Sequence, residues 1–414
     1  MRTGSSALAS LLGLALALAP PSARPDDVSS PPSAAPAPAP AGVEGTEGET
    51  HPREVVATRL RIADIADMGF RLRLQPRLDY GDLVTTGDGR AYSSEKDLYL
   101  RRVRISVTGS ALGQLRYVLT LSGDRVGQNG RANQVAVTDA AIEWRPGDFF
   151  ALRVGRAKLP LTRSGLTSSA RQLLVDRPLS VDAARGLFDD VNQPNLLVRS
   201  RLLGGAVALY AAVADGWSTG AAPYASGPGA KIRRSDPLVV ARVELSPPGF
   251  AESHKSDAHL GEGRHLTLGA DAAVQHGIEY ADAPGSEDRR LGGMDLSGHF
   301  GPLTLQVEAR WWEIKSSAAA RGTVQPHGVY GQAAWYVASL GVEPVVRYEA
   351  YVEDAARSDT GQTVLTLGLN AYLQRHSAKL QLAWVHRVFE GAASGHLPDA
   401  DHADAFQAQA QLYL

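Results

Sequence analysis

The chain has 414 residues, contains no cysteine and carries a formal net charge of −2 at pH 7. The near-neutral charge argues against a nucleic-acid-binding protein, which would need a strongly basic surface. The 42 glycines and 13 tyrosines suit a β-protein with many turns and with aromatic residues at an interface. The lack of cysteine is compatible with a chain that passes through an oxidising compartment before it folds.

The N-terminal segment has the pattern of a secretory signal peptide. Arg2 supplies a positive charge, residues 8–19 form an apolar run of twelve residues, and small residues follow up to Ala23. This run is too short to span a membrane as a helix. We therefore predict a signal peptide over residues 1–23. A disordered tail rich in alanine and leucine is the alternative.

Residues 24–67 are predicted to form a periplasmic linker. The stretch from residue 20 to residue 49 is rich in proline, alanine, serine and glycine, with alternating proline and alanine at residues 36–40. Such a segment cannot bury enough apolar surface to fold, and its prolines favour an extended chain. Residues 53–67 can form one short amphipathic helix, which would be marginal without a partner.

Residues 68–414 are predicted to form one all-β domain with about sixteen strands. Apolar and polar residues alternate with period two, and successive side chains of a strand point to opposite faces. Beyond the signal peptide no apolar stretch reaches the ~20 residues of a membrane helix, so a membrane form must be a barrel. The predicted strands lie at residues 69–80, 99–109, 114–122, 135–144, 149–155, 194–201, 206–213, 237–246, 264–276, 291–299, 303–314, 327–338, 342–352, 363–373, 378–389 and 404–414.

Long and short connections alternate along this domain. Transmembrane β-barrels have short periplasmic turns and long external loops. The connection at residues 247–263 breaks this rule, because it is long where a tight turn is expected. Four long polar connections lie at residues 123–134, 215–236, 277–290 and 391–403. Four short connections with glycine or proline lie at residues 145–148, 202–205, 301–302 and 339–341.

The last eleven residues predict how the barrel closes. Phe406 and the apolar residues at every second position up to Leu414 alternate with Gln407, Gln409 and Gln411. Apolar side chains should face lipid and glutamines the lumen. We expect this strand to pair with residues 69–80, because a membrane barrel leaves no edge unpaired. A soluble protein with several sheets would explain the alternation, but not the terminal strand, the signal peptide and the loop asymmetry together.

Arginines concentrate on one face of the first two predicted strands. Arg71, Arg73 and Arg77 share a face of the first, and Arg102 and Arg104 share a face of the second. An arginine that faces lipid at mid-membrane costs ~2–4 kcal/mol, so these side chains should point inward. Two interpretations stay open. The arginines can guide anions through the pore, or they can brace the wall by pairing with acidic residues, of which four have suitable positions: Asp79, Glu143, Glu244 and Glu308.

The longest connection, residues 156–191, combines basic and apolar residues. Arg156, Lys158 and Arg163 begin it, and Leu159 and Leu161 are two of its apolar residues. Loops of this length are usually functional or disordered. We predict that it packs inward as a constriction; an exposed external loop is the alternative.

The same region resembles the phosphate-selective porin O/P family. The matching motifs are Arg153-Val-Gly-Arg-Ala-Lys-Leu-Pro-Leu161, Leu166-Thr-Ser-Ser169 and Asp176-Arg-Pro-Leu179, preceded by Leu100-Arg-Arg-Val-Arg-Ile105 and Val137-Thr-Asp-Ala-Ala-Ile-Glu-Trp144. The resemblance covers about residues 98–180. It implies a sixteen-stranded channel of the bacterial outer membrane, commonly a homotrimer, with a constricting loop and basic residues that attract anions.

The predicted pore-lining set joins two kinds of inference. Arg102, Arg104, Arg156 and Lys158 lie in the segments that resemble the family. The others follow from strand parity or from the charge of the loop: Arg71, Arg73, Arg77 and Arg163. We expect a porin in contact with outer-membrane lipid that passes small anions, with phosphate as a candidate, and that needs no cofactor.

Two other classes of protein remain as alternatives. An outer-membrane hydrolase would need a nucleophile with an oriented base, and the sequence has no Gly-x-Ser-x-Gly elbow. The histidines at 254, 259, 265 and 276 lack a metal-ligand spacing, so we predict solvated residues and no metal site. A structural barrel anchored to the cell wall through residues 20–49 is the second alternative.

Overall fold

The computed structural model describes residues 58–62, 65–84, 92–129, 133–188, 191–217, 232–252, 254–281, 285–317, 322–391 and 401–414. The predicted signal peptide and most of the predicted linker lie outside these residues. Within the described ranges no helix is both long enough and apolar enough to cross a membrane.

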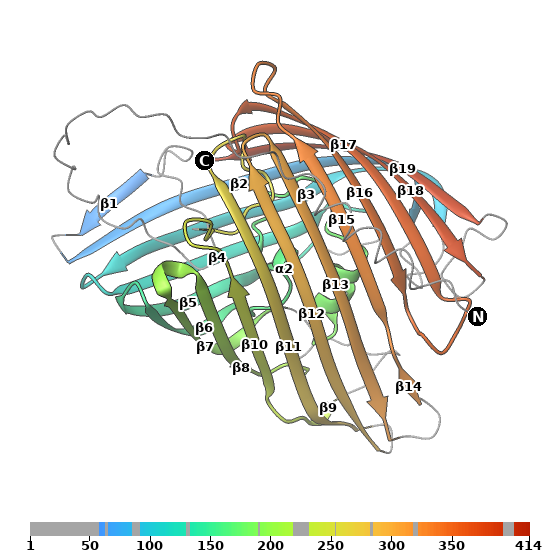
Figure 1. Ribbon diagram of the computed structural model, residues 1–414, viewed down its shortest axis with the longest axis horizontal. Coiled ribbons are helices and arrows are strands. Elements are labelled where there is room, and N and C mark those ends of the chain that lie inside the picture. Colours follow the sequence, from blue (N-terminus) through green and yellow to red (C-terminus); the bar gives the residue numbers. More distant parts are fainter. Residues whose placement is uncertain are drawn as a thin grey trace, which may run out of the picture. The chain divides into compact units, whose positions relative to one another are not determined.

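Sixteen strands form a closed antiparallel ring (Figure 1). Neighbours in the chain pair throughout, β8 pairs with β10, and β19 pairs with β2 to close the ring. All sixteen predicted segments are strands of this ring, so the predicted fold is confirmed. The ring consists of β2 (Ala66–Val84), β3 (Tyr92–Ala111), β4 (Leu115–Val126), β5 (Val135–Gly147), β6 (Phe150–Lys158), β7 (Asn192–Leu202), β8 (Val207–Ala214), β10 (Leu238–Leu245), β11 (Arg264–Tyr280), β12 (Ser286–Phe300), β13 (Leu303–Ser316), β15 (His327–Trp335), β16 (Val342–Val352), β17 (Gly361–Gln374), β18 (Ala378–Glu390) and β19 (His402–Tyr413).

Three short strands extend the ring. β9 (Ile232–Arg234) pairs with β11, and β14 (Thr323–Val324) pairs with β13. β1 (Thr58–Ile62) pairs with the start of β2, just beyond the place where β19 ends. The helix predicted over residues 53–67 is therefore wrong for residues 58–62. The edge of β2 left open beyond β19 offers backbone partners there, which a short isolated helix lacks.

The terminal strand closes the barrel in the predicted manner. Gln407 lies opposite Asp79, and Gln409 lies opposite Arg77. The backbones of Leu72 and Leu414 exchange two hydrogen bonds of 2.9 Å. The glutamine face of the last strand therefore continues the arginine face of the first, inside the ring.

The alternation of burial confirms the predicted faces. In β13, Glu308 and Arg310 are buried, whereas Trp311 is exposed. Leucine, isoleucine and valine side chains form much of the outer face, as Leu98, Ile105 and Ile142 illustrate with exposed fractions above one half. An outer surface of this kind is stable next to lipid and unfavourable in water.

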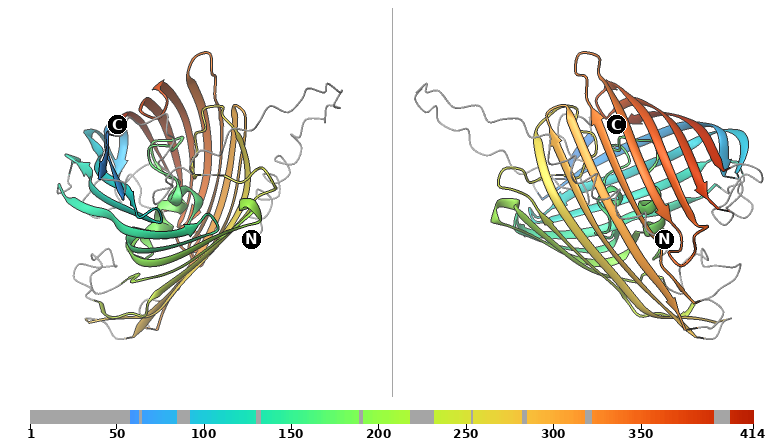
Figure 2. Two further views of the ribbon diagram at one scale, coloured as in Figure 1. Left: turned by 90° about the vertical axis from the view of Figure 1, so that its left-hand side faces the viewer. Right: turned by 45° about the vertical axis from the view of Figure 1, so that its right-hand side comes forward.

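The lumen holds two folded connections. One lies between β6 and β7 and contains α2 (Arg163–Leu166) and α3 (Leu179–Gly186), which lie inside the ring of strands (Figure 2). The other joins β10 to β11 over residues 246–263, the connection that broke the length rule. β10 and β11 still pair antiparallel from Val239 opposite Val274 to Leu245 opposite Leu268. The extra length therefore goes into the lumen.

Candidate functional site

The connection between β6 and β7 is an inner loop that packs against distant strands. Leu159 and Leu161 belong to a buried cluster that includes Leu238 and Val240 of β10. Leu173 belongs to a second buried cluster, which includes residues of β15, β16 and β18. Fully burying a leucine side chain contributes about 1.5–3 kcal/mol. The loop is therefore held inside the barrel by its apolar residues.

One carboxylate of the inner loop is held by the wall of the barrel. Asp176 accepts two hydrogen bonds from the Arg77 guanidinium of β2, at 2.6 and 2.7 Å. Gln407 of β19 donates a third at 3.0 Å. Burial alone would raise the pKa of Asp176, but Arg77 and further arginines hold this pKa well below its usual range. The carboxylate therefore stays ionised and keeps the loop attached.

A second ion pair joins the inner loop to the β10–β11 connection. The Arg163 guanidinium donates to both carboxylate oxygens of Glu252, at 2.6 and 2.9 Å. Both side chains are buried. Burial alone would raise the pKa of Glu252, but Arg163 and Lys255 hold it well below its usual range. The two connections therefore support each other inside the lumen.

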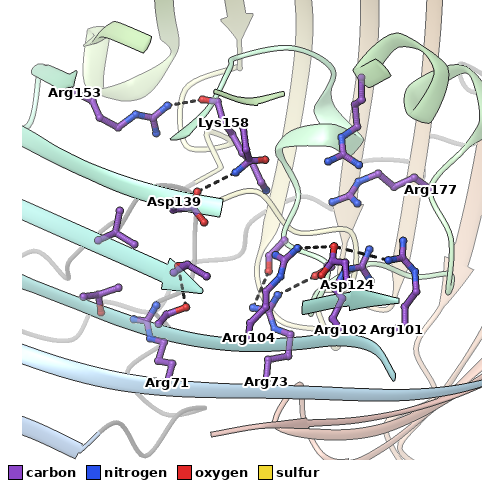
Figure 3. A pocket seen from close by; sticks show the side chains of 18 residues that line it. Arg71, Arg73, Arg101, Arg102, Arg104, Asp124, Asp139, Arg153, Lys158 and Arg177 are labelled. Carbon is purple, nitrogen blue, oxygen red and sulfur yellow. Dashed lines mark hydrogen bonds and ion pairs between the residues drawn. The ribbon is translucent and has the colours of Figure 1, made fainter. Parts of the chain in front are cut away.

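A strongly cationic pocket lies between the inner loop and strands β2–β6. Nine cationic side chains line it against two acidic ones, Asp124 and Asp139. Figure 3 shows Arg71, Arg73 and Arg104 on one side facing Lys158 on the other. The cationic members are Arg71, Arg73, Arg101, Arg102, Arg104, Arg153, Lys158, Arg177 and Arg185.

Neutral side chains orient several of these cations. Arg73 donates to Ser169 Oγ at 2.9 Å, and Arg102 donates to Gln75 Oε1 at 3.1 Å. Hydrogen bonds to neutral acceptors fix a guanidinium without cancelling its charge. These hydrogen bonds therefore hold the two guanidinium groups in place at the wall of the pocket.

The carboxylates are too few to neutralise the pocket. Asp124 lies 3.4 Å from Arg104 and 4.0 Å from Arg101. Burial, followed by the charge of Arg185, lowers the pKa of the Arg177 guanidinium to about 9. Such a shift means that the cation is held beside other cations in a poorly solvated place. An entering anion would relieve this repulsion.

Five of the eight predicted pore-lining residues meet in this pocket: Arg71, Arg73, Arg102, Arg104 and Lys158. The other three lie elsewhere. Arg77 and Arg163 are bound to carboxylates, as described above, and Arg156 lies opposite Pro194 on the β6–β7 pair. The structure thus separates two groups of arginines that the sequence pattern treats alike.

Arg101 reaches the pocket through an irregularity that strand parity cannot show. The β2–β3 register shifts between Gln75 and Pro76, so that Gln75 lies opposite Arg102 and Pro76 opposite Leu100. Arg101 is the extra residue of a bulge, and both Arg101 and Arg102 are buried. Proline lacks a backbone N–H and is confined to bulges or edges of sheets. The presence of Pro76 within the predicted strand at residues 69–80 is the sequence feature that could have indicated this bulge.

Arg153, Arg177 and Arg185 complete the pocket. Arg153 has the inward parity expected from the sequence, while Arg177 and Arg185 come from the inner loop. Their place depends on how the loop folds back, which no local pattern determines.

A second group of inward arginines occupies the opposite wall and is fully paired. Arg242 of β10 contacts Asp271 at 2.9 Å and Asp295 at 2.7 Å. Arg310 of β13 contacts Glu308 at 2.7 Å and also binds Asp271. All these side chains are completely buried. This part of the wall agrees with the bracing interpretation.

The prediction of solvated histidines is wrong for His265, which is 3% exposed. Its ring lies 4.7 Å from that of His259, centroid to centroid, and His259 is partly buried. His276 is about half exposed and contacts Asp288. His259 and His265 are withdrawn from solvent because the β10–β11 connection folds into the barrel instead of lying outside it.

A sixteen-stranded barrel with an apolar outer face, a polar interior and a loop folded into the lumen has the architecture of an outer-membrane porin. Residues 70–414 match the sequence profile of the family described as phosphate-selective porin O and P. The chain belongs to this family and is an outer-membrane porin, located in the bacterial outer membrane.

The chain is also similar to one further sequence and shares its fold with solved structures. A protein of Aquifex aeolicus (strain VF5), recorded as uncharacterized, is 29% identical over 336 residues, which are 75% of this chain and 80% of the relative. The structure of an anion-selective porin from Comamonas acidovorans is similar with a TM-score of 0.57 and 14% identity, covering 84% of this chain and 100% of that one. A trimer form of OmpT from Vibrio cholerae is similar with a TM-score of 0.51 and 10% identity, covering 85% and 100%.

Proposed function

We propose that this porin prefers anions and that the cationic pocket provides the preference. The observation that carries the proposal is the imbalance of nine cationic to two acidic side chains beside the inner loop. Rings of arginine and lysine lower the barrier for anions and raise it for cations. The printed description of the Comamonas acidovorans protein as anion-selective supports the same choice.

Small oxyanions, phosphate among them, are the proposed permeants. The guanidinium group presents a planar fork of donors that suits carboxylate and phosphate oxygens. Ser168 and Ser169 add hydroxyl groups to the same pocket. The family description names phosphate, which supports phosphate as the first anion to test.

The test is the reversal potential of a single channel in a planar bilayer with a KCl gradient. We expect the wild type to favour chloride over potassium, and a variant with Arg71, Arg73, Arg102 and Arg104 changed to Gln to shift toward potassium. A unit charge about 4 Å from an ion changes its energy by about 1 kcal/mol even in bulk water. Four lost charges should therefore change the permeability ratio by at least about tenfold.

A second quadruple variant provides the matched control. Arg233, Arg234, Arg357 and Arg375 all lie outside the pocket lining, and each has an exposed side chain paired with a carboxylate. Their replacement by Gln removes the same formal charge and should leave the reversal potential nearly unchanged. Equal shifts in the two variants would contradict the role of the pocket. Added phosphate should reduce chloride current in the wild type more than in the pocket variant.

A homotrimer in contact with outer-membrane lipid is the proposed assembly. The trimer form of the Vibrio cholerae protein supports the oligomeric state, and the exposed apolar residues of the outer face suit lipid or a neighbouring subunit. Mass measurement of the detergent complex by light scattering tests this, and a monomeric mass that persists across detergents would reject the trimer.

Passive diffusion is the proposed mode of action, without a catalytic step. Membership of a porin family and the channel architecture support it. One experiment distinguishes the cell-wall anchor from the channel. If the barrel is an anchor, deleting residues 24–52 should weaken cell-wall association without changing conductance.

A further inference from the structure

Three side chains with metal-ligand chemistry lie together at the end of the β10–β11 hairpin where the connection turns into the lumen. Glu252 and His259 belong to the connection, and His265 is the second residue of β11. One possible ligand atom of each lies within 4.8 Å of the others. In the part of the chain that the structure describes, no other group of three His, Cys, Asp or Glu residues meets this criterion. The cluster has no part in the cationic pocket.

The two imidazoles are oriented as metal ligands usually are. His259 Nε2 lies 3.0 Å from the carbonyl oxygen of Ser256, so this nitrogen carries the proton and donates it. Its Nδ1 is then left with a lone pair. His265 Nε2 lies 3.3 Å from Ser297 Oγ. A hydroxyl can accept, and when Nε2 donates to it, Nδ1 of His265 also carries a lone pair. A ligating histidine characteristically donates its other N–H to a carbonyl or similar acceptor, which fixes the tautomer and the ring.

Glu252 retains one position for a cation although Arg163 binds it. An ionised carboxylate has about four acceptor positions. The guanidinium occupies one on each oxygen, and the backbone N–H of Ser256 donates to Oε1 at 3.1 Å, so the second position on Oε2 is the one that a cation can take. The ammonium of Lys255 lies 3.4 Å from Oε2 of Glu252, but only 2.7 Å from Glu244. A metal ion can replace the longer contact while Lys255 keeps the shorter one.

The neighbouring His299 closes one side of the cluster. Its ring stacks on His259 with 4.2 Å between the centroids. Its Nε2 lies 2.8 Å from the carbonyl oxygen of Glu262, and its Nδ1 lies 3.4 Å from Thr304 Oγ1. Because both nitrogens are engaged, His299 shapes the cluster and is not counted as a ligand.

We propose that Glu252, His259 and His265 form a binding site for a divalent transition-metal ion of the Zn²⁺ class. Two imidazoles and one carboxylate are a ligand set of tetrahedral zinc sites that keep a fourth position open. Imidazole nitrogen suits zinc, copper or nickel, whereas calcium and magnesium prefer oxygen alone. Bonds of ~2.0–2.2 Å require the three ligand atoms to lie ~3.5 Å apart. The connection must therefore tighten slightly around the ion.

Such an ion would stiffen the interior of the porin. It would join the connection to β11 and, through the Glu252–Arg163 pair, to α2 of the inner loop. This inference does not depend on the proposed anion preference, since binding of a metal and selectivity of the pore are measured separately.

The test uses the full chain purified in detergent and stripped with EDTA. Zn²⁺ is titrated in competition with a chromophoric chelator, and Co²⁺ is added in a parallel sample to read the visible spectrum. We expect one ion per chain and the Co²⁺ absorption typical of tetrahedral coordination. In the H259N/H265N variant we expect affinity to fall at least about 100-fold, because loss of a mere orienting partner already costs 10–100-fold.

A histidine pair elsewhere provides the control. His386 and His402 have ring centroids 6.0 Å apart, and His386 contacts Asp404. H386N/H402N removes the same chemistry at a distance from the cluster and should keep the wild-type affinity. The heat-dependent shift in electrophoretic mobility shows that each variant is a folded barrel. The proposal is overturned by equal Zn²⁺ affinity in wild type and H259N/H265N, by loss only in H386N/H402N, or by a wild type that binds no ion.

Discussion

Two regions of the inner wall contain similar arginines in opposite electrostatic settings. On strands β2–β6 together with the inner loop that faces them, which we call the cationic wall, nine cationic side chains share two carboxylates and line a pocket. On strands β10–β13, the paired wall, Arg242 and Arg310 lie among four carboxylates, Glu244, Asp271, Asp295 and Glu308, and are completely buried. We propose that an inward arginine serves permeation on the first wall and stability on the second, according to the local supply of carboxylates.

The physical reason for the difference is desolvation. A buried charge without a partner costs several kcal/mol, so the paired wall needs its carboxylates to fold. The cationic wall lines a pocket, where an entering anion would supply the negative charge that the two carboxylates do not. The bracing interpretation therefore fits the paired wall, and anion guiding is our proposal for the cationic wall.

The largest difference between the two walls is expected when one arginine is removed from each. Arg310→Met takes the cationic partner from Glu308 and leaves Asp271 with Arg242 alone in the paired wall, which should lower the free energy of unfolding by about 3–5 kcal/mol. Arg104→Gln relieves repulsion in the cationic wall and should change it by less than about 1 kcal/mol. Urea unfolding of barrels refolded into lipid vesicles measures both. Similar losses in the two variants would remove the distinction between the walls.

Arg77 sharpens the comparison because it lies on β2 but is paired with Asp176 of the inner loop. A double-mutant cycle with Arg77→Gln and Asp176→Asn should give a coupling energy of about 0.5–3 kcal/mol. Either single variant should also increase fluctuations of the single-channel current, because the loop loses an attachment. A coupling energy of zero with an unchanged current would show that the apolar residues alone hold the loop.

Ionic strength provides a smaller effect that distinguishes the pocket from a simple size filter. The Debye length is about 10 Å at 0.1 M salt and about 3 Å at 1 M. The preference for chloride over potassium should therefore weaken as KCl is raised from 0.1 M to 1 M. The reversal potential at a constant concentration ratio measures this, and a preference that does not change with salt would point to a cause other than the charged wall.

The smallest effect is expected from pH. The pKa values of Asp176 and Glu252 are both held well below their usual range by arginines. A carboxylate whose folded-state pKa is lowered stabilises the fold fully above its unfolded pKa of about 4, and this stabilisation is lost as pH falls through the lower value. The conductance should thus stay constant from pH 7 to about pH 4, and change only below it. Asp176→Asn should abolish part of that acid transition; a transition near pH 6 would contradict these pairs.

Much of the fold could be predicted from the chain because the signals are local. Period-two alternation identified all sixteen barrel strands, and the requirement that a membrane barrel leaves no edge unpaired identified β2 as the partner of the last strand. The helix expected over residues 53–67 failed at β1, because an open sheet edge supplied partners that no local window contains.

The candidate site was less predictable. Parity placed Arg71, Arg73, Arg102 and Arg104 correctly in the lumen, but it also included Arg77, whose charge is bound by Asp176. Arg101 was missed because of the bulge opposite Pro76. Arg163 and the histidines at 259 and 265 depend on the β10–β11 connection, whose length was visible but whose inward fold was not.

The sequence by itself determined which side chains face the lumen, since the direction of a side chain in a strand depends only on its position relative to its immediate neighbours. The tertiary structure alone decided which inward arginines are bound by carboxylates of distant segments and which line the cationic pocket. That outcome depends on strand register, on the bulge in β3 and on two connections that return into the barrel. Each of these brings together charges that are far apart in the chain, and the electrostatic energy of an arginine depends on those neighbours and on its exposure to water.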